Sequence, residues 1–172
     1  MGPEAPSRVN PSPLKSEFSS REVAQVARVS LAQLQWWDER GILSPSRKGR
    51  KRAYLPKHVI EVLVIAELRR KGMSLQSVRR VLRLLRREMD EWPARVLSGE
   101  NLHLLTDGKS VHLENEPAAI IDRLKTARRP MLLISVGDQV KRLGDFEKKR
   151  QARESARRQQ PQTVQDQLPL FS

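Results

Sequence analysis

Apolar residues recur every three to four positions along the first half of the chain, and this helical period begins in two short segments. We expect a first helix over residues 20–28 and a second over residues 31–40, with Gly41 ending the second. Ser19 and Ser30 each precede one segment and have Glu or Gln three positions later, which is the spacing of a helix-capping box. Two short helices joined by so short a turn predict a helix-turn-helix unit. Their apolar faces consist of Val23, Val26, Ala27, Leu34 and Trp37.

A basic hairpin and two longer helices are predicted next. Gly49 stands among five cations in residues 46–54 and permits the tight turn of a hairpin, or wing. Pro56 favours the start of a third helix, Gly72 ends it, and Ser74 caps a fourth. The buried stripes of these helices are expected to contain Val59, Val62, Leu63, Ala66, Leu68, Met73, Leu75, Val78, Val81, Leu82 and Leu85. The outer face of the fourth helix carries Arg79, Arg80, Arg83, Arg86 and Arg87, which either extend a basic binding surface or are simply solvated.

A different pattern occupies residues 94–146. Two apolar runs flank an Asp107-Gly108 turn and predict a β-hairpin, and residues 131–136 predict a short buried strand. Between them we expect a helix over residues 117–128, with three residues facing inward: Ile120, Ile121 and Leu124. Val140 and Leu143 indicate a closing turn of helix. A module of this size is marginal alone, so packing against the fourth helix or self-association should complete its core.

The two ends of the chain lack such patterns. Residues 1–16 contain four prolines and are expected to form a flexible arm. Residues 147–172 are expected to form a disordered basic tail or, from Lys148 onward, a frayed basic helix. The predicted fold is therefore mainly α: a winged helix-turn-helix domain over residues 17–92, a small α+β module over residues 94–146, and the tail.

Composition narrows the chemistry. The net charge of +13 favours polyanionic partners and above all nucleic acid, although a solvated surface or a basic helix on a membrane would also fit charge alone. No cysteine is present, and the three histidines, His58, His103 and His112, have no metal-ligand spacing. We find no catalytic constellation and expect neither enzyme activity, metal nor cofactor. No apolar run approaches membrane-spanning length, so we expect a cytoplasmic, nucleoid-associated protein without a membrane partner.

The segment from Phe18 to Leu85 resembles the mercury-resistance regulator (MerR) family of bacterial transcription factors at nearly every spacing of its helix-turn-helix and wing. The resemblance implies a sequence-specific transcriptional regulator that binds double-stranded DNA as a homodimer, with RNA polymerase at promoters as a further partner. Most relatives then continue into a long dimerisation helix, which Pro93 interrupts here. Dimerisation would instead use residues 94–146, which we favour over a ligand-sensing role for them, or a shorter apolar seam of Leu84, Leu85, Met89 and Trp92.

The candidate DNA-binding residues fall into two groups. The N-terminal part and outer face of the second helix should contact base edges or adjacent phosphates through Ser30, Leu31, Ala32, Gln33, Gln35 and Trp36. The wing should contact flanking phosphates through Arg47, Lys48, Arg50, Lys51, Arg52 and Tyr54, of which the last two match the family's wing-exit motif. The family has arginine where this chain has Gln35, and the neutral amide loses a charge-assisted phosphate contact. Trp37 is expected to be a core residue.

The end of the chain suggests a second hypothesis. Four residues near the C-terminus resemble a pentapeptide by which bacterial replication and repair proteins bind the sliding clamp: Gln167, Leu168, Leu170 and Phe171. The alternative function is therefore a DNA-binding accessory factor of replication or repair that the clamp recruits.

Overall fold

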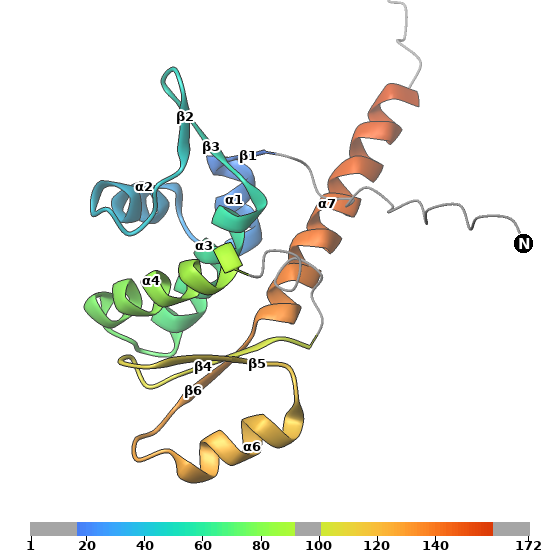
Figure 1. Cartoon of the computed structure of the whole chain (residues 1–172). Helices are drawn as coiled ribbons and strands as arrows, with labels where there is room; N and C mark the ends of the chain where they lie inside the picture. Colours follow the sequence, from blue (N-terminus) through green and yellow to red (C-terminus); the bar gives the residue numbers. More distant parts are fainter. Residues whose placement is uncertain (1–16, 92–100, 160–172) are drawn as a thin grey trace, which may run out of the picture.

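The protein forms a helical body with a three-stranded antiparallel sheet at each of two sides (Figure 1). A computed structural model describes residues 17–91 and 101–159. The order of elements is β1 (Phe18–Ser19), α1 (Ser20–Ala27), α2 (Leu31–Glu39), β2 (Ser46–Lys48), β3 (Lys51–Tyr54), α3 (Pro56–Arg70), α4 (Leu75–Glu91), β4 (His103–Thr106), β5 (Val111–Glu114), α6 (Pro117–Thr126), β6 (Leu132–Ser135) and α7 (Val136–Gln159).

The predicted helix-turn-helix unit is confirmed. The Ser19 hydroxyl accepts a hydrogen bond from the Glu22 backbone N–H, and the Glu22 carboxylate accepts one from the Ser19 N–H, so the capping box of α1 is complete. At α2, the Ser30 hydroxyl accepts from the Gln33 N–H at 3.0 Å. Arg28, in the left-handed conformation with φ of 55°, ends α1 and turns the chain towards α2.

The wing is also confirmed and belongs to a small sheet of strand order β1-β3-β2. Gly49 has φ of 62°, and a Cβ atom there would meet nothing within 4 Å. Backbone conformation rather than space therefore favours glycine at this turn. The pairing of β1 with β3, which places Phe18 opposite Tyr54, was not predicted, because a strand of two residues has no recognisable period.

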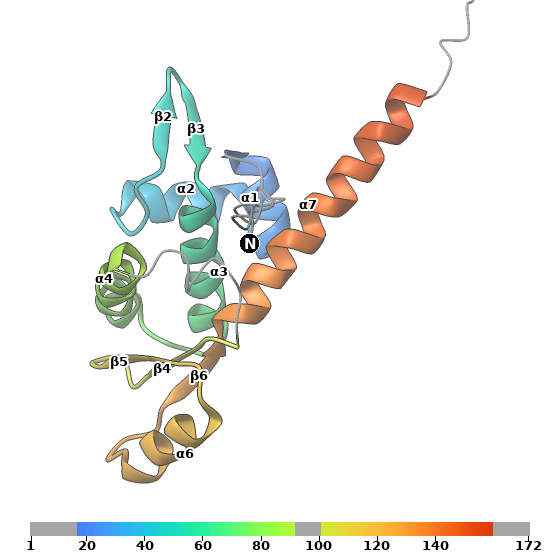
Figure 2. The same cartoon turned by 45° about the vertical axis from the view of Figure 1, so that its right-hand side comes forward.

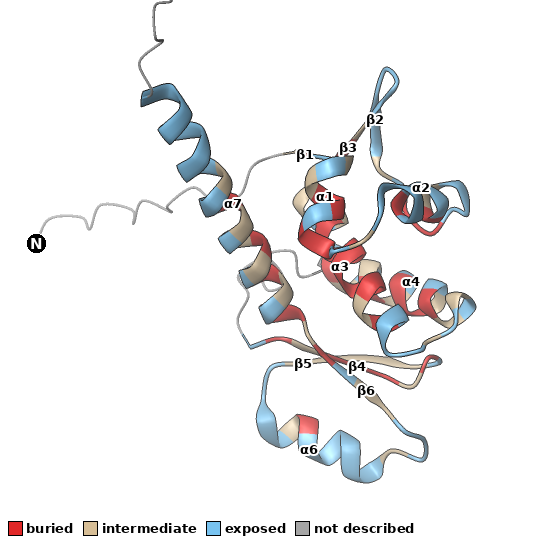
Figure 3. Cartoon of the chain, turned by 180° about the vertical axis from the view of Figure 1, so that it is seen from behind, coloured by how far each residue is buried: buried red, intermediate tan, exposed pale blue. Residues whose placement is uncertain are grey.

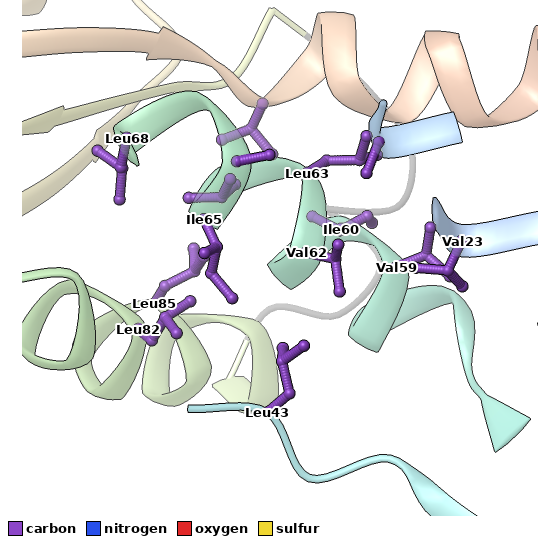
Figure 4. Packing of buried hydrophobic residues seen from close by; sticks show 14 of the residues in the cluster. Val23, Leu43, Val59, Ile60, Val62, Leu63, Ile65, Leu68, Leu82 and Leu85 are labelled. Atoms are coloured by element: carbon purple, nitrogen blue, oxygen red, sulfur yellow. The ribbon is translucent and has the colours of Figure 1, made fainter. Parts of the chain in front are cut away.

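The central helix α3 lies between the helix-turn-helix unit and the rest of the molecule, and side chains from α1, α4 and the α2–β2 loop converge on it (Figure 4). Val78, Val81, Leu82 and Leu85 of α4 are fully buried, as predicted. Met89 is also buried, at 6% exposure. The proposed dimerisation seam is therefore wrong for Leu85 and Met89, because both residues are buried within the core of their own chain, and Trp92 lies outside the described residues.

The second sheet has the order β5-β4-β6 and confirms the predicted hairpin and third strand. At its turn, the Asp107 carboxylate accepts hydrogen bonds from the backbone N–H groups of Ser110 and Lys109, which lower the pKa of Asp107 to about 2. Helix α6 covers one face of this sheet (Figures 1 and 2). Only Ile120 of its three predicted inward residues is buried. The prediction was wrong for Ile121 and Leu124, which are 50% and 43% exposed because α6 packs along one side only.

The opposite face of the sheet packs on the body and completes the core, as one of the two sequence alternatives required. Leu104 of β4 and Ile134 of β6 belong to the same buried cluster as α3 and α4. At the hairpin turn, Arg80 donates to the Gly108 carbonyl at 3.3 Å. A Cβ atom at Gly108 would lie 3.2 Å from the Ser77 hydroxyl, so the turn approaches α4 closely.

The largest departure from the sequence analysis is α7. Val140 and Leu143 lie not in a closing turn but in a helix that continues to Gln159, through the expected boundary at residues 146 and 147. Of the two alternatives for the tail, helix is observed over residues 147–159 and disorder is wrong there, and residues 160–172 lie outside the described part of the chain. Glu147 is buried and pairs with Arg150, and the exposed remainder has (i, i+4) ion pairs around Glu154. The helix passes α3 and α1 and then extends beyond them (Figure 2).

A partly buried ion pair joins α3 to α4. The Arg86 guanidinium lies 2.8 Å from the Glu61 carboxylate, whose side chain is 5% exposed, and also donates to the Ile42 carbonyl at 2.7 Å. We expect Arg86→Ala to lower the free energy of unfolding by about 1 to 3 kcal/mol, because it leaves the buried Glu61 carboxylate without its cation, while solvent partly screens the 36% exposed guanidinium. Urea unfolding would measure this, with the exposed neighbour Arg87→Ala as control.

The double substitution Glu61→Leu/Arg86→Met removes both charges and keeps the volume, so it should recover most of the lost stability. An Arg86→Ala variant as stable as the Arg87→Ala control would contradict a structural role for this pair.

None of the helices in the described part of the chain is both long and apolar enough to cross a membrane. Within residues 17–91 and 101–159, no cluster of three or more His, Asp or Glu side chains is arranged to hold a metal ion.

Candidate DNA-binding surface

Three arginines from the scaffold helices fix the ends of the helix-turn-helix. Arg70 of α3 donates to the Ala27 carbonyl at the end of α1, at 2.6 Å. Arg79 of α4 donates to the Arg40 carbonyl after α2, also at 2.6 Å, and Arg86 bonds Ile42. The last carbonyls of a helix have no intrahelical partner and carry partial negative charge, so cations stabilise them. These arginines position α2 and are neither simply solvated nor free for DNA.

The outer face of α2 is exposed along its whole length, as predicted (Figure 3). Leu34 and Trp37 point into the core at 1% exposure each, whereas Leu31 and Trp36 are 47% and 40% exposed. Leu31 does not belong to the buried cluster formed by the described residues. The exposed predicted residues on this face are Ser30, Leu31, Ala32, Gln33, Gln35 and Trp36.

Two side-chain contacts order the C-terminal half of this face. The Arg40 guanidinium lies over the Trp36 ring, 5.2 Å from its centroid. Gln35 donates to the Glu39 carboxylate at 2.7 Å. Trp36 therefore presents its indole together with the cation of Arg40 on the same exposed face.

The wing projects from the body beside α2 (Figure 1), and four of its cations are exposed: Arg47, Lys48, Arg50 and Lys51. Lys48 pairs with Glu17 at 2.6 Å. A loop with this many exposed cations next to a recognition helix has the geometry and charge to contact phosphates on either side of a groove.

Asp38 joins the recognition helix to the wing. Its carboxylate, 10% exposed, accepts hydrogen bonds from Arg52 on β3 at 2.5 Å and from Arg47 on β2 at 3.2 Å. The wing and α2 are thereby held as one surface, and Arg52 is oriented by this contact rather than extended into solvent.

Tyr54 differs from the other predicted site residues, because it is fully buried against Phe18 and the core. Burial raises the pKa of its hydroxyl above the ordinary value. We therefore assign Tyr54 to the packing of the wing base and leave it out of the candidate surface.

The helix-turn-helix and the wing together match a known protein family. Residues 18–85 match the family model of the MerR HTH family regulatory proteins. This part of the chain is a MerR-type domain. The match includes α1, α2, the wing, α3 and most of α4, which together form the surface described above, and it covers less than half of the chain. A comparison with curated proteins gave no match.

Sequence reasoning missed two residues of the MerR-type surface. Arg40 was treated only as a helix end, although its spacing of four from Trp36 is the spacing at which helix side chains meet. Asp38 was given no role, because its partners Arg47 and Arg52 lie 9 and 14 positions away in the sequence. The clamp-like residues Gln167, Leu168, Leu170 and Phe171 lie outside the described residues.

We predict that Asp38→Asn lowers the ratio of specific to non-specific DNA affinity, because the wing is no longer held to α2. It should also cost about 1 to 3 kcal/mol of stability, since the carboxylate is nearly buried. The matched control is Glu39→Gln, which removes the same charge from the same helix without touching the wing. Fluorescence anisotropy with target and random duplexes measures both affinities, and equal ratios for the two variants would refute the role of Asp38.

Proposed function

We propose that this protein is a sequence-specific transcription regulator that binds double-stranded DNA as two identical copies. The observation that carries the proposal is the exposed start of α2 beside the cationic wing. Leu31, Ala32 and Gln33 are the residues that enter a major groove first when a recognition helix docks by its N-terminal end. Apolar side chains suit the thymine methyl group, and a glutamine amide can form two hydrogen bonds to the major-groove edge of adenine, at N6 and N7.

The contacts around this surface support a rigid docking element. Ser30 caps α2, three arginines fix the helix ends, and Asp38 fixes the wing. A recognition helix that is already ordered loses little conformational entropy on binding. Two copies would place their α2 helices in successive major grooves, about 34 to 36 Å apart, on an inverted repeat. Such binding is compatible with either of two outcomes, activation through promoter distortion or repression by occupancy.

Selection of genomic fragments by the purified protein, at near-physiological salt, tests the proposal. Enrichment of a short inverted repeat near promoters is the expected result. Bound fragments without a common sequence would contradict sequence specificity and favour the accessory-factor hypothesis.

Gln33→Ala is predicted to change which base is preferred at one position of each half-site, at a cost of about 1 to 3 kcal/mol for the original target. Repeating the selection with the variant measures this. Gln35→Ala is the control, because Gln35 is held by Glu39 and should leave the preferred sequence unchanged. An unchanged preference in the Gln33→Ala protein would show that another residue contacts the bases.

A further inference from the structure

The edge strand β6 has no strand paired to its outer side within the described residues. In the order β5-β4-β6, it has a described strand on one side only, and none of its residues is charged. Proteins usually protect open edges with charged side chains or covering segments, because unpaired backbone groups pair with other strands. The opposite edge, β5, follows this rule, since its Glu114 forms an ion pair at 2.6 Å with Arg123 of α6.

An apolar strip lies beside this edge. Leu105 of β4 stands opposite His112 and Leu133 in the register, so the three side chains share the face that α6 covers. Leu105 is fully buried, whereas Leu133 on β6 is 42% exposed. Helix α6 therefore covers this face of the sheet over β4 but leaves it partly exposed at β6.

The exposed residues of α6 belong to the same strip. Arg123 marks the side of α6 that faces β5. Ile121 is two positions away, or about 160° around the helix axis, so it projects on the β6 side. The strip thus consists of Ile121, Leu124 and Leu133, each more than two fifths exposed.

We propose that β6 pairs antiparallel with β6 of a second copy of this chain. The two sheets then form one continuous sheet, and the strips of both copies meet across the two-fold axis on the α6 side. The inference deepens the proposed function, which needs two copies, by assigning the surface that joins them.

Charge at the two ends of β6 favours a second copy over an unrelated strand. Arg128 and Arg129 precede β6, and Asp138 follows it; all three are exposed, and none has an ion-pair partner within the described residues. Antiparallel pairing brings the start of one β6 to the end of the other, so the arginines of each copy meet Asp138 of the other. The uncharged strand between them avoids the like-charge repulsion expected elsewhere in a chain of net charge +13.

The first test compares two exposed leucines. Sedimentation or light scattering should give twice the chain mass for the unmodified protein and the mass of one chain for Leu133→Lys, because a lysine at this edge brings two like charges together. Leu31→Lys is the matched control, since Leu31 is 47% exposed on α2, and it should keep the double mass. Circular dichroism confirms that each variant is folded. A Leu133→Lys protein of double mass would overturn the proposal.

The second test is specific to antiparallel self-pairing. Asp138→Arg and the double variant Arg128→Glu/Arg129→Glu should each weaken the dimer at least tenfold, because like charges now meet at both ends. Mixed in equal amounts, they should form a heterodimer with both ends complementary again. Failure of the mixture to associate more strongly than either variant alone contradicts the pairing.

Failure of this surface and failure of the proposed function give different results. If the unmodified protein is a dimer on an inverted repeat and Leu133→Lys leaves it so, only the β6 surface is wrong. If one copy binds each duplex and the selected fragments share a single half-site, both the β6 pairing and the two-copy arrangement are wrong, while sequence-specific binding stands.

Discussion

Alanine at Trp37 should lower mainly the stability of the protein, whereas alanine at the adjacent Trp36 should lower mainly its DNA affinity. Trp37→Ala is expected to lower the free energy of unfolding by about 3 to 5 kcal/mol, because a large aromatic side chain at 1% exposure leaves a cavity among Leu34, Ile42 and Leu43. Trp36→Ala should cost about 1 kcal/mol or less, since it mainly removes an exposed contact with Arg40.

DNA affinity should change in the reverse order, because Trp36 is on the candidate surface and Trp37 is not. Urea unfolding followed by circular dichroism measures stability, and anisotropy measures binding under conditions in which each variant is folded. Should Trp37→Ala not fold, Trp37→Phe gives a smaller loss with the same sign. Equal stability of the Trp36 and Trp37 variants would contradict the assigned orientation of α2.

The second large effect is expected in the wing. Replacing Arg47, Lys48, Arg50 and Lys51 together with alanine should weaken binding to every DNA sequence by roughly a hundredfold to a thousandfold at near-physiological salt. If all four contact phosphates, the slope of log affinity against log salt concentration should become shallower by about 3 to 4, since each neutralised phosphate contributes about 0.9.

The control for the wing variant has the same net charge as that variant but keeps the wing unchanged. Alanine at Lys149, Arg153, Arg157 and Arg158, all exposed on α7, also lowers the charge from +13 by four to +9. This variant should retain most of the affinity and of the salt slope. Equal losses in both variants would show that total charge decides binding, and not the position of the wing.

The sequence predicted the features that depend on neighbouring residues. Ser19 and Ser30 marked two helix starts, and Gly49 marked the wing turn, because caps and tight turns are determined within a few positions. The buried stripe of α4 was equally predictable from its period, with Val78, Val81, Leu82 and Leu85 in the core.

Features that depend on distant partners were missed. Ile121 fits an apolar helix face as well as Ile120 does, and only the width of the sheet beneath α6 decides which one is buried. Asp38 received no role because the arginines that it holds come from another element. A helix was one alternative for the tail, but its unbroken continuation from Leu143 was not predicted, because the residues that stabilise it are charged: Glu147 and Glu154, with Arg150 between them.

Helix α7 packs on residues 18–85 from outside the range that the family model matches. Residues 18–85 are the unit that the family model matches, but α3 within them packs against Val136, Val140 and Leu143 of α7. A fragment ending after α4 would expose that side of α3 to water. The matched unit and the folding unit therefore have different boundaries, and tests of the proposed DNA binding should use the whole chain.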